Sequence, residues 1–573
     1  MTRRLVLAAL AFAVPAMGQE AAPFASGERP RSGDGGPMAA DPYRWLEEVE
    51  STQALSWVRA RNAESLAELS ADPRFEPFRS DIRSILNAAD RIPAPIWRGG
   101  LVHNFWQDSS HVRGLWRSAS LEEYRKSEPA WRVLLDMDKL GREEGESWVW
   151  KGAECLPPHA RRCLVDLSRG GKDAYEVREF DLDAATFAAG GFRLPEAKHR
   201  LAWMDEESLL IGTDYGPGSL TLSGYPRVLK SWHRGEPLAG APLVFEGKES
   251  DVSVEPMSFF RPEGTLVLIS RSVTYFESEF HRVLPGGKVR RLALPLDAGI
   301  EDWFEGKLLV RLLKDWRVGK EVFKTGSLIA VPDDAYGEGD LAGRVELVYE
   351  PGLRSSLAGV WAVRGALYLL TRENVVSRLW AARRDDAVWM LKPVSLPADG
   401  THGMAAGDSF RDELFASYES FLVPSTLHLL RTPGAAPELL KRLPARFDAS
   451  GLESAQYEAV SADGTKVPYF LVSRKGMHKD GSTPVLLYGY GGFQIVYGPS
   501  YLQVPGKVWL EKGGAYALAN IRGGGEFGPA WHQAALKEKR PRAFEDFIAV
   551  AEDIVARKVS EPRRLGIMGG SNG

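Results

Sequence analysis

The feature that most constrains this chain is a run of small residues around one serine. Residues 569–573 read Gly-Gly-Ser-Asn-Gly. Small residues on both sides of a serine permit the tight turn that lifts a hydroxyl out of the end of a strand. An apolar run at 564–568 leads into this turn and is typical of a buried parallel strand. Before it, Pro541 precedes an apolar stripe at helical spacing, made up of Phe544, Phe547, Ile548, Ala551, Ile554 and Val555. Helix, strand and tight turn in this order predict part of an α/β sheet.

Ser571 is therefore the candidate nucleophile, and Gly569, Gly570 and Gly573 are the small residues of its turn. In α/β-hydrolases the catalytic acid and histidine follow the serine in chain order. All ten histidines here precede Ser571. We expect a serine hydrolase cut short after its nucleophile, without its catalytic Asp and His, and inactive as written. A Gly-Ser turn with no chemical role is the alternative.

Length and charge exclude several other classes. A chain of 573 residues is too long for one ordinary core, so two or more domains are expected. The 72 basic and 76 acidic residues give a net charge of −4. This balance does not favour nucleic acid or an anionic membrane as a partner. No cofactor is expected, and the chain is expected to be a monomer.

The first 18 residues have the order of a secretory signal. Arg3 and Arg4 precede an apolar stretch that is too short to span a bilayer, and small residues follow it. We expect residues 1–18 to be a signal peptide, 19–40 a disordered linker, and the mature protein periplasmic or secreted. A buried N-terminal helix is the alternative.

Two cysteines, Cys155 and Cys163, are separated by seven residues that include two prolines. In an oxidising compartment such a pair can close a disulfide across a turn. Two free buried thiols are the alternative. A metal site is not expected, because two thiols and one nearby histidine leave the coordination shell short.

From about 94 to 443 the sequence is rich in short β-type runs separated by turn residues. Aromatic or apolar strand starts recur every 44 to 58 residues, close to the length of one propeller blade. The starts are near Trp97, Trp148, Trp203, Phe259, Trp303, Trp361 and Phe410. The spacing predicts a β-propeller, with seven blades as the expected number and a pair of sandwiches as the alternative.

Four segments carry a family resemblance. They are DPYRWLE at 41–47, LYGYGGF at 487–493, ANIRGGGEFG at 519–528 and GGSNG at 569–573. Together they resemble the prolyl oligopeptidase family of serine peptidases. The resemblance implies an α/β-hydrolase domain capped by a seven-bladed propeller. The implied domains are a helical arm at 41–90, a propeller at 91–446 and a hydrolase domain at 447–573.

The resemblance also implies roles for individual residues. Ser571 resembles the nucleophile, and the backbone N–H of Asn572 resembles one donor of the oxyanion hole. The Tyr490 hydroxyl resembles the second donor, and Phe493 resembles a wall of the substrate pocket. Fixed donors aimed at a developing oxyanion are each worth about 3 to 4 kcal/mol. The alternatives are an ordinary loop tyrosine and a core phenylalanine.

The three glycines at 523–525 do not fit a phosphate-binding loop, because the Lys-Ser/Thr pair that follows such a loop is missing. A tight turn beside the active site is expected, with Arg522 and Glu526 as possible polar lining. A surface ion pair between these two residues is the alternative.

The function expected from these observations is hydrolysis of short peptides, preferably after proline, through an acyl-enzyme. A preference after basic residues, as in the related oligopeptidase B group, is the less favoured specificity, because the YGYGGF and Asn-Ile-Arg segments resemble the prolyl branch more closely. Two alternative functions also remain open. One is an esterase built on the same serine turn, and the other is a propeller scaffold with a degenerate hydrolase remnant.

Overall fold

The computed structural model describes residues 41–573 except Ala406 and Thr432. The described residues divide into two compact units, 41–86 and 87–573. The expected signal peptide and linker lie outside the described residues. No helix in the described part of the chain is both long enough and apolar enough to cross a membrane.

The unit at 41–86 is helical. It contains the 3₁₀ helix η1 (Arg44–Glu47), α1 (Thr52–Ala71) and α2 (Phe75–Leu86). Ser51 caps α1, because its hydroxyl accepts a hydrogen bond from the backbone N–H of Ala54.

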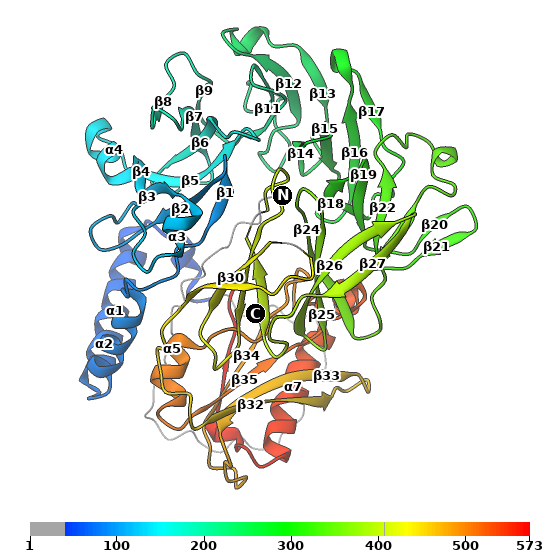
Figure 1. Cartoon of the computed structure of the whole chain (residues 1–573). Helices are drawn as coiled ribbons and strands as arrows, with labels where there is room; N and C mark the ends of the chain where they lie inside the picture. Colours follow the sequence, from blue (N-terminus) through cyan, green and yellow to red (C-terminus); the bar gives the residue numbers. More distant parts are fainter. Residues whose placement is uncertain (1–40, 406, 432) are drawn as a thin grey trace. The chain divides into compact units, whose positions relative to one another are not determined.

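Seven sheets follow one another along the chain in the described residues after position 87, from blue through green to yellow in Figure 1. All strand pairs within them are antiparallel. The first three sheets contain β1 (Ile96–Arg98), β2 (Leu101–Trp106), β3 (Leu115–Ala119) and β4 (Arg132–Asp136); β5 (Trp148–Cys155), β6 (Arg162–Arg169), β7 (Tyr175–Asp181), β8 (Thr186–Phe187) and β9 (Arg193–Ala197); β10 (Arg200–Trp203), β11 (Ser208–Gly212), β12 (Val228–His233) and β13 (Leu243–Glu246).

The fourth to seventh sheets contain β14 (Ser253–Arg261), β15 (Gly264–Ser272), β16 (Ser278–Val283) and β17 (Val289–Arg291); β18 (Ala298–Phe304), β19 (Lys307–Leu312), β22 (Leu328–Pro332) and β23 (Glu346–Tyr349); β24 (Ser355–Ala362), β25 (Leu367–Glu373), β26 (Val376–Asp385) and β27 (Val388–Pro393); β28 (Thr401–Met404), β29 (Leu414–Glu419), β30 (Thr426–Leu430) and β31 (Glu438–Arg442). The hairpin β20 (Trp316–Val318) and β21 (Glu321–Phe323) extends from the fifth sheet's connections. The helices α3 (Leu121–Arg125) and α4 (Met137–Glu144) lie before and after β4 in sequence. These sheets confirm the seven-bladed propeller.

Six of the seven expected aromatic starts lie in the first strand of a sheet. They are Trp97, Trp148, Trp203, Phe259, Trp303 and Trp361. The prediction for Phe410 is wrong, because this residue lies in the connection between β28 and β29. The seventh sheet starts at Thr401 without an aromatic residue.

Cys155 and Cys163 are directly opposite one another in β5 and β6, and their sulfur atoms form a disulfide. The bond links the end of β5 to the start of β6, on either side of the loop that connects the two strands. It also lies beside the first sheet, since Arg98 of β1 donates a hydrogen bond to the Ala153 carbonyl oxygen at 2.7 Å.

Residues 452–573, called the α/β part below, form a five-stranded sheet in the order β32-β33-β35-β34-β36. β34 pairs in parallel with both β35 and β36, while β32 and β33 form an antiparallel hairpin. The strands are β32 (Leu452–Val460), β33 (Lys466–Arg474), β34 (Val485–Gly489), β35 (Ala515–Ala519) and β36 (Leu565–Met568). The helices are α5 (Gln503–Pro505), the π-helical turn η5 (Gly506–Leu510), α6 (Pro529–Gln533), the 3₁₀ helix η6 (Lys537–Lys539), α7 (Pro541–Ala556) and the 3₁₀ helix η7 (Pro562–Arg564).

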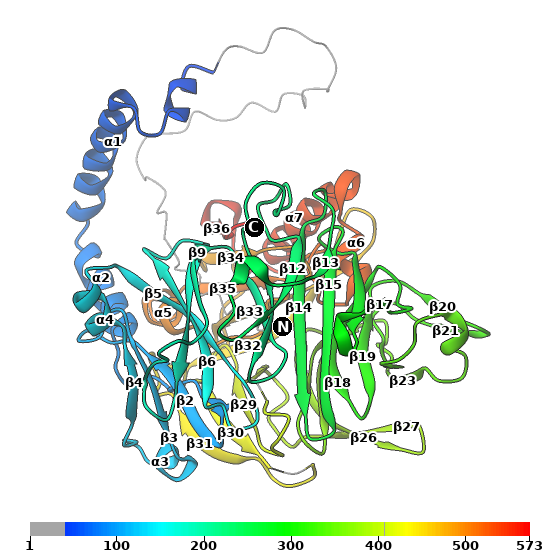
Figure 2. The same cartoon turned by 90° about the horizontal axis from the view of Figure 1, so that it is seen from above.

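α7 begins at Pro541, where the sequence predicts a helix start, and β36 ends beside the marked C-terminus in Figure 2. Two details differ from the sequence prediction. Phe544 and Ile548 of the expected apolar stripe are more than half exposed, because α7 buries a neighbouring face that includes Ala549 and Val550. The run at 564–568 is not a buried strand: β36 is an edge strand, and Ile567 is 70% exposed.

Candidate active site

The serine turn has the strained backbone that such a turn requires. Ser571 has φ +53°, in the left-handed region that residues with a side chain rarely adopt. The backbone N–H of Gly573 donates to the Gly570 carbonyl oxygen at 2.9 Å and closes the turn. A Cβ added to Gly569 would lie 2.3 Å from the Gly573 carbonyl oxygen, so position 569 has no space for a larger residue. Ser571 itself is exposed.

This turn packs against the loop that follows β34. The Asn572 side-chain amide donates to the carbonyl oxygens of Tyr490 at 2.9 Å and Gly491 at 3.3 Å. A Cβ added to Gly492 would lie 2.3 Å from the Asn572 side chain, and one added to Gly573 would lie 2.4 Å from the Gly489 carbonyl oxygen. Two segments 80 residues apart in sequence are therefore held in backbone contact through their small residues.

Tyr490 is fixed by its aromatic neighbours. Its side chain is buried, and its ring centroid lies 5.4 Å from that of Tyr497. Within the described residues, neither the Tyr490 hydroxyl nor the backbone N–H of Asn572 has a protein hydrogen-bond partner. Two donors on adjoining segments are thus available to a ligand.

Phe493 is half exposed rather than part of the core. Both Phe493 and Gln494 have positive φ, +53° and +57°, so the loop is strained at the point where this ring projects. The Phe493 ring lies edge-to-face with Tyr275 of the propeller, with centroids 5.9 Å apart. The strained loop therefore presents an apolar ring between the propeller and the α/β part.

The three glycines at 523–525 allow close backbone approach. A Cβ on Gly523 would lie 2.3 Å from the Gly491 carbonyl oxygen, and one on Gly525 would lie 2.2 Å from the Gln494 carbonyl oxygen. The glycine loop is therefore a support on which the loop carrying Tyr490 and Phe493 rests.

Arg522 is neither a surface residue nor paired with Glu526. It is 3% exposed, and its guanidinium donates to both oxygens of Asp546 in α7 and to Asp463 in the β32–β33 turn. The hydrogen bonds from Arg522 hold the pKa of Asp463 well below its usual range. This buried cluster joins the glycine loop to α7 and to the hairpin, so Arg522 holds the loop in place instead of lining the site.

Glu526 is also buried, at 3% exposed, and burial raises the pKa of its carboxyl to about 7. The side-chain amide of Asn520 lies 3.4 Å from one carboxyl oxygen and donates to the Tyr497 carbonyl oxygen at 2.8 Å. The Ser356 hydroxyl of the propeller donates to the Glu526 backbone carbonyl oxygen at 3.0 Å. Sequence reasoning missed Asn520 and Tyr497, although Asn520 begins the Asn-Ile-Arg segment.

No histidine of the described residues hydrogen-bonds to Ser571. The nearest in sequence, His532, is buried and its Nδ1 lies 2.6 Å from the Gly523 carbonyl oxygen, and burial lowers its pKa. Across residues 41–573, apart from the two positions left out, no group of three or more His, Cys, Asp or Glu side chains could hold a metal ion. The arrangement provides an exposed serine, two free donors and an apolar ring.

Comparison with known proteins assigns the family. The N-terminal β-propeller domain of prolyl oligopeptidase matches residues 28–442, and the prolyl oligopeptidase family domain matches 504–573. The chain belongs to the prolyl oligopeptidase family. Its seven blades and its partial α/β-hydrolase sheet match the architecture of solved members of that family.

One relative and one solved structure match more than nine tenths of the chain, and a second relative matches about a third of it. An uncharacterized peptidase of Sinorhizobium fredii is 43% identical over 93% of this chain and 75% of its own length. A prolyl endopeptidase of Elizabethkingia miricola is 35% identical over 32% of this chain and 26% of its own. The structure of a post-proline cleaving enzyme from Rickettsia typhi superposes with a TM-score of 0.86 at 30% identity, over 92% of this chain and 79% of that one.

Proposed function

We propose that this prolyl oligopeptidase family chain carries the nucleophile and oxyanion hole of a serine peptidase that cleaves short peptides after proline. The observation that supports this most strongly is the contact between two strained segments. Ser571 is exposed at positive φ, and Asn572 bonds the loop that carries Tyr490. The proline preference is supported by the similarity of this chain to the post-proline cleaving enzyme from Rickettsia typhi.

In this proposal the Ser571 oxygen attacks the scissile carbonyl carbon. The hydroxyl proton ends on the amine nitrogen of the leaving peptide as the C–N bond breaks, and the acyl group remains as an ester on Ser571. The negative charge that develops on the carbonyl oxygen is stabilised by the Tyr490 hydroxyl and the Asn572 backbone N–H. Phe493 supplies an apolar surface for the residue before the scissile bond. No described histidine pairs with Ser571, so we expect turnover by this chain alone to be negligible: losing triad members costs up to about 10⁶ in turnover in one serine protease.

A fluorophosphonate probe tests the proposal without requiring turnover. Oxyanion donors and binding alone keep about 10³ to 10⁴-fold of reactivity over water in serine proteases. We expect slow labelling that maps to Ser571 by mass spectrometry and is absent from Ser571→Ala. A peptide ending in proline should protect Ser571 better than the same peptide ending in arginine. Labelling spread over many serines would favour the scaffold alternative, and equal protection would remove the proline preference.

We also propose that residues 1–18 direct export to the periplasm or outside the cell. The Cys155–Cys163 disulfide supports this, because disulfides persist in oxidising compartments. Expression in a Gram-negative host should place the protein in the periplasmic fraction with Gln19 at its N-terminus. Cytoplasmic protein that retains Met1 would contradict the proposal.

A further inference from the structure

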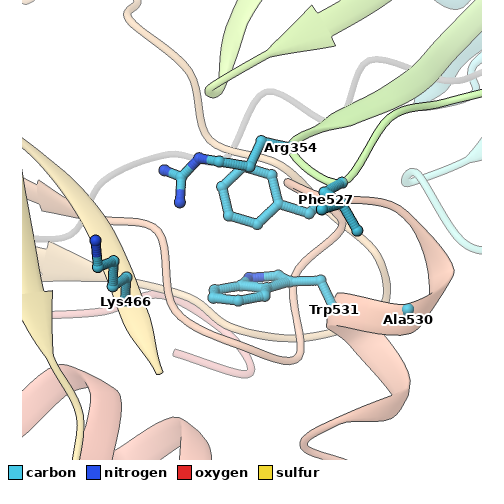
Figure 3. Close-up of a pocket in the computed structure, with 6 residues that line it drawn as sticks. Arg354, Lys466, Phe527, Ala530 and Trp531 are labelled. Atoms are coloured by element: carbon cyan, nitrogen blue, oxygen red, sulfur yellow. The ribbon is translucent and has the colours of Figure 1, made fainter. Parts of the chain in front are cut away.

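A cavity of about 320 Å³ lies where the propeller meets the α/β part (Figure 3). None of its lining residues belongs to the serine turn or to the loop that carries Tyr490. The propeller contributes the segment before β24, and the α/β part contributes the start of β33, the segment between the glycine loop and α6, and α6 itself. The lining residues are Leu353, Arg354, Lys466, Phe527, Ala530 and Trp531.

One wall of this cavity is aromatic. The rings of Phe527 and Trp531 meet edge-to-face, with centroids 4.9 Å apart. The Arg354 guanidinium lies over the Phe527 ring, 4.7 Å from its centroid. In Figure 3 the Lys466 side chain lies across the opening from these two rings. An apolar group that entered the cavity would pack against the two aromatic rings. A polar end on the same ligand would then lie near the Arg354 and Lys466 cations.

The polar groups at the cavity are mostly donors. Arg354 is 2.7 Å from a Glu458 oxygen and donates to the Asn374 side chain at 2.5 Å. Lys466 is 3.9 Å from Glu458, and its side chain is 69% exposed. The Trp531 indole nitrogen is buried and has no acceptor among the described residues. The Glu458 carboxylate therefore lies near two cations, and the Trp531 N–H is a further donor at the cavity without an acceptor among the described residues, so a second anionic group would find donors there.

We propose that this cavity binds the carboxyl terminus of a short peptide whose last side chain is apolar. The terminal carboxylate accepts hydrogen bonds from Lys466 and Arg354, and the last side chain packs against Phe527 and Trp531. A volume of 320 Å³ is at the small end of ligand sites, which suits one end of a peptide rather than an extended segment.

Binding of a peptide carboxylate in this cavity does not require catalysis. The identification of the ligand as a reaction product rests on the proposed function. Hydrolysis of a peptide bond adds water across it and leaves a new carboxylate on the N-terminal product. A peptidase therefore generates the ligand class that this cavity fits. Because Arg354 belongs to the propeller and Lys466 to the α/β part, a bound product ties the two together.

Calorimetric titration of the Ser571→Ala chain tests the inference, because this variant cannot turn over a peptide through Ser571. The probe is Ala-Ala-Leu as the free acid and as the amide. The amide lacks the negative charge that strengthens hydrogen bonds from Lys466 and Arg354, so the acid should bind about tenfold or more tightly than the amide. Because the Lys466 side chain is exposed and solvent screens its charge, Lys466→Gln should weaken acid binding by about two- to fivefold. Lys479→Gln removes the same charge from an exposed loop and should leave acid binding unchanged.

Three results would overturn the inference. They are equal binding of acid and amide, equal effects of Lys466→Gln and Lys479→Gln, and binding of Ala-Ala-Asp as tight as that of Ala-Ala-Leu. Failure of the proposed function is distinguishable from these. If the probe does not label Ser571 but acid binding still depends on Lys466, the proposed catalysis is wrong and the carboxylate site stands.

Discussion

The propeller and the α/β part reach their structures by different physical routes. Each propeller sheet consists of antiparallel strands that lie close together in sequence. In four of the seven sheets the first strand carries a buried aromatic residue, namely Trp97, Trp148, Trp203 and Trp303. The α/β part joins segments that are far apart in sequence, through parallel pairing, a buried ion cluster and backbone contacts at glycines. The propeller therefore follows from patterns that are local in sequence. The candidate site depends on long-range contacts, and few substitutions at those contacts would be tolerated.

The largest change in stability is expected for a substitution in the propeller. Trp203 is fully buried in β10, and its indole donates to the Glu154 carbonyl oxygen at 3.1 Å. Trp203→Ala should lower the free energy of unfolding by about 4 kcal/mol, because it removes a large buried ring and leaves a cavity. Denaturant unfolding measures the loss. Probe labelling at Ser571 below the unfolding transition should be unchanged; a parallel loss of labelling would mean that the two regions are not separable.

A comparable substitution in the α/β part should affect the site as well as stability. Asp546→Ala leaves Arg522 buried with Asp463 as its remaining carboxylate partner, and breaking a buried ion pair costs about 3 kcal/mol or more. Denaturant unfolding should show this loss together with slower labelling at Ser571. Asp480→Ala, in an exposed turn, is the control and should change neither. An unchanged rate of labelling at Ser571 in Asp546→Ala would show that the site does not depend on the Arg522 ion cluster.

The pH dependence of stability distinguishes the regions further. The Glu526 carboxyl has a folded pKa of about 7, above its ordinary 4.5, so the folded state holds this proton more strongly than the unfolded state. The free energy of unfolding should therefore fall as the pH rises from about 4.5 to about 7, by up to about 3 kcal/mol at 1.4 kcal/mol per pKa unit. Glu526→Gln should flatten this slope in thermal melts at several pH values. An identical slope in the variant would show that Glu526 titrates normally.

The same contrast explains what the sequence could predict. Six strand starts could be located from aromatic spacing because each blade repeats the same local pattern, and Phe410 failed because the seventh blade begins at Thr401 without an aromatic residue. The glycine loop could be identified as a turn, but its contacts with Gly491 and Gln494 could not be foreseen from the sequence.

Arg522 and Glu526 illustrate the same limit at single residues. Both carry charges that usually lie at the surface, and both are buried here. The partners of Arg522 are 24 and 59 residues away in sequence, and they meet only when α7 and the β32–β33 turn pack together. A charged residue beside a glycine turn therefore does not reveal whether it lines a site or supports it.

The central claim is that the serine turn and the loop carrying Tyr490 form one oxyanion site. The most direct test is the rate of fluorophosphonate labelling at Ser571 in Tyr490→Phe, with Tyr457→Phe of β32 as the matched control. Loss of one oxyanion donor should slow labelling about 10²-fold or more, while the control should label at the wild-type rate. Equal rates in the wild type and Tyr490→Phe would contradict the claim.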